Sequence, residues 1–104
     1  MNRILLFRFR PGVPIREVED TLHLAMFAVE GLAGRVRVGL DANYLVDAPS
    51  RSVLVDEGSF VGWLIARVFA ALLAREFGEP SFTATRPLDP QVVVTPCERE
   101  EVCA

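Results

Sequence analysis

Arginine is the residue type in this chain whose spacing best fits a ligand site. Arg8 and Arg10 alternate along the segment 3–10, and Arg37 lies in a second alternating segment, 35–44. If both segments are strands of one sheet, these three side chains stand on the same face. Guanidinium groups bind carboxylates and phosphates through paired hydrogen bonds. The pattern therefore predicts a site for a small anionic molecule at Arg8, Arg10 and Arg37.

The same arginines have a simpler role as partners of nearby carboxylates. Asp41 and Asp56 fall within predicted strands, where they could pair with an arginine on an exposed face of the sheet. Ion pairs on exposed faces are common and contribute little to stability or function. Local pairing is the interpretation that the sequence favours, and the anion site is its alternative.

His23 is the single histidine, and it falls in the middle of a predicted helix with Asp20 one turn earlier. A histidine that a carboxylate orients can act as a general base. No motif for a nucleophile or a metal site, such as G-x-S-x-G or H-E-x-x-H, accompanies it. We therefore expect His23 to lie on a helix surface, we predict no catalytic residue, and the sequence favours a protein that is not an enzyme.

Carboxylates and thiols give no clear metal site. Four acidic residues could supply oxygen ligands for Mg²⁺, but all four suit turns and helix caps, which we favour: Asp41, Asp47, Asp56 and Glu57. Cys97 and Cys103 have C-x5-C spacing instead of the C-x2-C of zinc sites, and only one histidine is present. We expect no metal and no cofactor, and we expect free thiols, with a disulfide as the alternative.

Apolar residues in the first third of the chain alternate as in a strand and then recur as in a helix. In residues 3–10, three side chains share the face that we expect to be buried: Leu5, Phe7 and Phe9. From Ile15 onward, apolar residues recur every three or four positions. This spacing predicts an amphipathic helix that ends near Gly31 or Gly34.

The next residues, up to 86, give four further segments. Alternation predicts strands at 35–44, 52–56 and 81–86, the first two joined by a turn into a hairpin. A continuous apolar run predicts a helix over 60–77, which Gly78 ends.

This order, β-α-β-β-α-β, is that of the ferredoxin-like plait. The plait is an α+β fold in which an antiparallel sheet of four strands carries two helices on one face. We predict one such domain over residues 1–87, because 104 residues suffice for a single core. Residues 88–104 then form a C-terminal tail, whose stretch QVVVTP is a candidate for an extra edge strand.

The helix predicted over 60–77 is apolar nearly all round. Between residues 60 and 74 only Gly62 and Arg67 interrupt the apolar run, whereas a helix on a two-layer domain keeps a polar outer stripe. The run is shorter than the roughly 18 apolar residues that cross a membrane. We expect protein to cover its outer face. The predicted interface consists of Trp63, Ala66, Arg67, Ala70, Leu73 and Ala74.

Small residues recur at every fourth position of that helix: Gly62, Ala66, Ala70 and Ala74. Such a ridge lets another backbone approach closely. Self-association is the interpretation that we favour. The alternatives are that the ridge packs against the first helix or the sheet, or that the C-terminal tail covers it.

Composition restricts the partners. The net charge is −3 and the pI about 5.1, so phosphate backbones and anionic lipids are disfavoured, and we expect neither a nucleic-acid nor a membrane partner.

All eleven basic residues are arginine, which is typical of a GC-rich bacterial genome. The apolar stretch near the start is too short for a signal peptide, so we expect a cytoplasmic location.

Taken together, these features predict a small interaction or regulatory module without catalysis. Its expected partner is a second copy of the chain, as a homodimer, or another protein. A second hypothesis is a dimeric α/β domain that binds or transforms a small anionic ligand through the sheet-face arginines. A third is a subunit of a larger complex.

Overall fold

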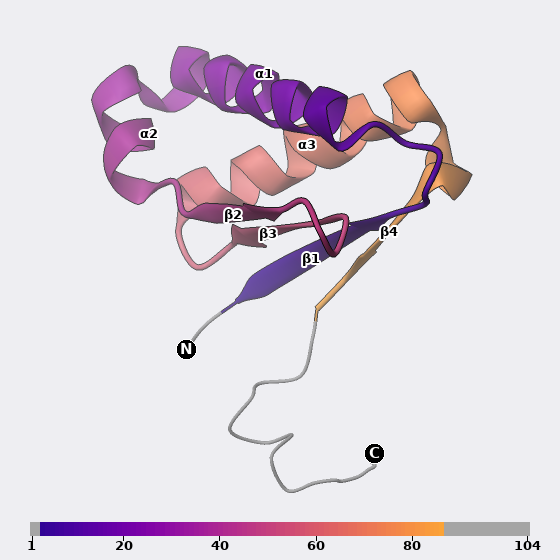
Figure 1. Cartoon of the computed structure of the whole chain (residues 1–104). Coiled ribbons are helices and arrows are strands. Elements are labelled where there is room, and N and C mark those ends of the chain that lie inside the picture. Colours follow the sequence, from indigo (N-terminus) through magenta and orange to yellow (C-terminus); the bar gives the residue numbers. More distant parts are fainter. Residues whose placement is uncertain (1–2, 87–104) are drawn as a thin grey trace, which may run out of the picture.

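In the computed structural model, which describes residues 3–86, an antiparallel sheet of four strands packs against α-helices (Figure 1). The elements in chain order are β1 (Ile4–Phe9), α1 (Ile15–Ala33), α2 (Arg35–Asp41), β2 (Tyr44–Asp47), β3 (Ser52–Asp56), α3 (Phe60–Phe77), the 3₁₀ turn η1 (Glu79–Ser81) and β4 (Phe82–Thr85). The sheet order is β2-β3-β1-β4, and each neighbouring pair is antiparallel. The predicted α+β class and four-stranded antiparallel sheet are confirmed.

β1 is the central strand, and its alternation separates two environments. Phe7 and Phe9 are buried beneath the helices, whereas Arg8 between them is exposed on the other face. Phe7 packs edge-on against Phe69 of α3, with ring centroids 4.8 Å apart. The predicted buried face of this strand is therefore confirmed.

α1 and α3 lie on the same face of the sheet and pack along each other (Figure 1). The buried side of α1 follows the predicted three- and four-residue spacing, with Val18, Leu22, Ala25 and Val29 fully buried. The hydroxyl of Thr21 on α1 donates to a carboxylate oxygen of Glu76 on α3 at 2.8 Å. Apolar packing together with this hydrogen bond joins the two helices.

α3 begins and ends where the sequence predicts. The Ser59 hydroxyl accepts a hydrogen bond from the Gly62 N–H at 2.9 Å, which satisfies one of the free donors of the first turn. Gly78 ends the helix with φ 89°, a left-handed value that favours glycine. The prediction for residues 60–77 is thus confirmed at both ends.

The strand predicted over 35–44 is wrong. Gly34, with φ 93°, ends α1, and the chain turns directly into the short helix α2. In this helix only Val38 reaches the core, whereas Val36 stays 76% exposed. The strand starts only at Tyr44, so a hairpin of β2 and β3 forms, but its first arm shares only Tyr44 with the predicted strand.

The extra helix changes the predicted element order. The described residues contain three α-helices in place of two, in the order β-α-α-β-β-α-β, so the order β-α-β-β-α-β is not the one found. The predicted tail at 88–104 and its candidate edge strand lie outside the described residues.

Candidate functional site

The three arginines of the predicted anion site do not come together. Arg8 stands exposed on the open side of β1. The Arg10 side chain donates through Nε to the carbonyl of Pro80 at 2.6 Å, which ties the end of β1 to η1. Arg37 is not on the sheet, because its segment is helical, and it pairs with Asp41 one turn away at 3.4 Å. A joint site of Arg8, Arg10 and Arg37 is therefore wrong, and for Arg37 the local pairing is confirmed.

The face of the sheet opposite α1 and α3 carries an apolar row, and we call it the open sheet face. Leu45 of β2, Leu54 of β3 and Leu6 of β1 lie directly across from one another in the register. Ile4 extends this row along β1. Among the described residues, no element packs over this face (Figure 1).

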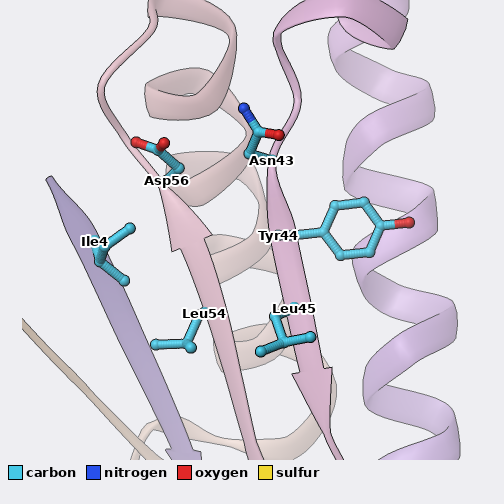
Figure 2. A pocket seen from close by; sticks show the side chains of 6 residues that line it. All are labelled: Ile4, Asn43, Tyr44, Leu45, Leu54 and Asp56. Atoms are coloured by element: carbon cyan, nitrogen blue, oxygen red, sulfur yellow. The ribbon is translucent and has the colours of Figure 1, made fainter. Parts of the chain in front are cut away.

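Part of this face is hollowed. A shallow pocket of about 220 Å³ lies over Ile4, Leu45 and Leu54, with Asp56 and Asn43 at one end (Figure 2). Leu45 is 58% exposed, although leucine is among the residues most often buried. In the single chain, the pocket is therefore part of an apolar surface that is exposed to solvent.

The two ends of the open sheet face differ in charge. At one end, Ile4 lies across from Asp56, whose carboxylate also accepts a hydrogen bond from the Gly58 N–H at 2.7 Å. At the other end, Arg8 lies between Ser52 and Thr83 on the neighbouring strands. Within residues 3–86, Arg8 has no ion-pair partner. The apolar row is thus bordered by Asp56 at one end and by Arg8 at the other, where Asp47 of β2 also lies across from Ser52.

The six residues predicted as an interface on α3 divide into three groups. Ala66 and Leu73 are buried in the core of the chain, so they are not available to a partner. Ala70 and Ala74 are half-buried. Only Trp63 and Arg67 reach the outer surface, where the Arg67 guanidinium carbon lies 5.0 Å from the centre of the Trp63 ring.

The outer side of α3 nevertheless carries aromatic surface. Phe60 is 70% exposed and stacks on Trp63, with ring centroids 6.2 Å apart and planes 17° from parallel. Five other exposed apolar side chains lie on α1 and α2: Leu24, Phe27, Leu32, Val36 and Leu40. These side chains are spread over separate helices, unlike the continuous row on the open sheet face.

An ion pair with a buried carboxylate lies beside α3. Glu57 has a side chain only 2% exposed, and one of its oxygens accepts hydrogen bonds from Arg86 Nη2 at 2.7 Å and Nε at 3.1 Å. Arg86 itself is half-exposed. From the sequence, Glu57 was expected to be a cap or turn residue, because nothing in the order of residues connects it with a position 29 residues later.

Arg51 is a second residue that the sequence analysis missed. It lies in the turn before β3 with φ 55°, a left-handed conformation uncommon outside glycine. Its Nη2 donates to the carbonyls of Arg10 and Val13, which fixes the loop between β1 and α1. Arg51 therefore has a structural role.

The remaining candidates stay apart. His23 is exposed on α1, and its ring faces the edge of Tyr44 at 6.4 Å between centroids. Within residues 3–86, no three side chains of His, Cys, Asp or Glu lie close enough together to hold a metal ion. Cys97 and Cys103 lie outside the described residues. None of the helices in the described part has the length and apolar character needed to cross a membrane.

Comparison of the chain with protein-family models, with curated proteins and with solved structures finds no match in any of the three. The function of these surfaces therefore has to be inferred from their own chemistry.

Proposed function

We propose that this protein is a non-catalytic interaction module that forms a homodimer through the open sheet face. The observation that carries the proposal is the row Leu45–Leu54–Leu6, which crosses three strands on the face that no described element covers. Contiguous exposed apolar surface marks interaction sites in soluble proteins. Burial of this row against a partner provides the driving force.

Arg8, which has no ion-pair partner within residues 3–86, supports a second copy of the chain as the partner. In a two-fold pair, each residue i that contacts j is matched by j contacting i. If the axis runs between the two sheets and across their strands, the Arg8 end of one copy faces the Asp56 end of the other. Leu54 and Leu6 then meet their own counterparts at the centre, and Arg8 of each copy lies at the Asp56 end of the other.

The outer side of α3, where the sequence analysis placed the interface, is the competing surface. Its exposed aromatic pair, Phe60 and Trp63, is of the type that dominates binding energies at interfaces. However, two of the six residues predicted there are buried within the chain, and the guanidinium of Arg67 already covers part of Trp63. The row on the open sheet face, by contrast, is contiguous across three strands.

The proposal includes a fold assignment. The chain is a variant of the ferredoxin-like plait in which α2 is inserted between α1 and the hairpin. The central position of β1 between β3 and β4 supports this assignment, and so does the location of α1 and α3 on one face (Figure 1). Without α2, the order of the elements would be the one predicted from the sequence.

The test is the mass of the particle in solution. We expect wild-type protein to be a dimer by light scattering after size-exclusion chromatography. Leu54→Glu should weaken the dimer about 100-fold or more, because two carboxylates would be buried at its centre. Arg8→Glu should weaken it less, through the lost ion pairs.

Two matched variants act as controls. Leu32→Glu places the same charge on α1, where Leu32 is 75% exposed, and Arg67→Glu reverses a charge on α3. Both variants should remain dimeric. A monomeric wild-type protein at high micromolar concentration would overturn the proposal. Dissociation by Arg67→Glu with no effect of Leu54→Glu would move the interface to α3.

A further inference from the structure

A cavity at the edge of the sheet is separate from the open sheet face. It has a volume of about 210 Å³ and lies between α3 and the pair of strands β1 and β4. Leu5 and Ala84 contribute to it from the helix-facing side of these strands, and Ala66 and Ala70 contribute from α3. Because three of these four side chains are alanines, the space between helix and sheet is not filled there.

Two arginines and one carboxylate surround the same cavity. Glu57 lines it, but one oxygen of this carboxylate already accepts two hydrogen bonds from Arg86. Its charge is therefore neutralised by one guanidinium. The ion pair also fixes Arg86 beside the cavity, since the Glu57 side chain is almost completely buried.

Arg67 is the second arginine of the cavity. Its guanidinium lies 5.0 Å from the centre of the Trp63 ring, which holds it near the wall formed by α3. No carboxylate of residues 3–86 forms an ion pair with it. The charged groups that line the cavity thus sum to one net positive charge, carried by an arginine without an acidic partner in this part of the chain.

We propose that this cavity binds a small organic anion, namely a carboxylate with a short apolar body. The carboxylate group binds Arg67 and the remaining N–H donors of Arg86, because guanidinium groups pair with carboxylates in a planar, bidentate geometry. The apolar body lies against Leu5 and the alanines. The volume is below the roughly 300–1,000 Å³ of sites for drug-sized ligands, which restricts the ligand to a short chain or a single ring.

The proposal does not depend on dimerisation. The cavity is on the helix side of the sheet, whereas the proposed dimer uses the opposite face. A dimer that does not bind the anion would contradict only the ligand proposal. A monomer that binds the anion would contradict only the dimer proposal.

The test uses hexanoate as the anion and 1-hexanol as the uncharged control, each titrated into the full chain by calorimetry. We expect saturable binding of hexanoate with a Kd of about 1 mM or tighter. The affinity for 1-hexanol should be weaker by a factor of about 10 or more. Arg67→Gln should weaken hexanoate binding about 10-fold or more through the loss of a charged hydrogen bond.

A pair of neighbouring alanines provides the control for shape. Ala70→Leu adds three carbons inside the cavity and should abolish binding, whereas Ala71→Leu adds them on the exposed side of α3 and should leave it unchanged. If Ala70→Leu fails to fold, Arg67→Gln decides the question, because Arg67 is exposed. Absence of saturable binding, equal binding of 1-hexanol, or an unchanged Kd in Arg67→Gln would overturn the proposal.

Discussion

At the scale of single residues, Gly62 has the tightest surroundings of any glycine in residues 3–86. A Cβ at this position would lie 1.9 Å from the carbonyl oxygen of Asp56. In the sequence, Gly62 begins a ridge of small residues along the helix, which was expected to let another backbone approach. The backbone that approaches is the end of β3 in the same chain. The first turn of α3 can therefore lie directly against the sheet.

Gly62→Ala should destabilise the fold by about 2 kcal/mol or more, because the carbonyl cannot move without disturbing the end of β3. Gly31→Ala on α1 is the matched control, since a Cβ there meets nothing within 4 Å. It should stabilise the protein by about 0.5–1 kcal/mol through helix propensity. The measurement is chemical denaturation followed by circular dichroism. Equal effects of the two substitutions would contradict the close approach.

At the scale of elements, the apolar residues of α2 fit both a strand and a helix in the sequence, and their burial distinguishes the two. In a strand, Val36, Val38 and Leu40 would share a face, and all three would be buried together. In the helix, Val38 is 2% exposed, whereas Val36 and Leu40 are 76% and 74% exposed. The 3.6-residue period of a helix thus directs one of these residues to the core and the other two to solvent.

Val38→Ala should reduce the free energy of unfolding by about 1–3 kcal/mol, because it leaves a cavity in the core. Val36→Ala should change it by less than about 0.5 kcal/mol, since its side chain is already in water and alanine favours helix. Equilibrium unfolding in urea measures both values. Losses of similar size at the two positions would indicate that this segment is a strand.

At the scale of the whole molecule, the structure is two-layered, with helices on one face of the sheet and an apolar row on the other (Figure 1). In such a molecule, the helix-facing side of the sheet supplies the core, including Phe7, Val53 and Val55. The other side of the sheet contributes little to the stability of the single chain. Its apolar residues are only partly buried in the single chain, so a partner that covered them would add to its stability.

A dimer through this face makes thermal stability depend on protein concentration. A tenfold increase in concentration should raise the Tm of the wild-type protein by about 3–5 °C, because association stabilises the folded state by mass action. The Tm of Leu54→Glu should stay constant over the same range. Differential scanning calorimetry at several concentrations gives both results. A wild-type Tm that does not change with concentration would contradict dimer formation through any face.

Much of the fold could be predicted because its patterns are local. The alternation around Phe7 and Phe9 predicted β1 and its buried side, and the boundaries of α3 followed from its continuous apolar run and from Gly78. The segment 35–44 could not be assigned correctly, because it is short and its valines alternate with polar residues, a pattern that is typical of a strand. Only the turn at Gly34 and the core position left for Val38 favour the helix.

The candidate site could be predicted only in part. Arg8 was assigned correctly to the exposed face of β1, and Phe7 and Phe9 to the buried face, since alternation separates the two faces. The pairing of Glu57 with Arg86 and the cavity bordered by Arg67 depend on strands that meet across the sheet. Contacts between residues so distant in the chain leave no periodic signal in the sequence.

By itself, the sequence therefore determined the α+β class, the buried face of β1 and the extent of α3, because side-chain periodicity and helix-end residues act over a few neighbouring positions. Only the tertiary structure decided that α2 is a helix, that the Leu45–Leu54–Leu6 row forms and that Arg37 lies away from the sheet. These features depend on strand register and on the space left in the core, which arise when distant segments pack together.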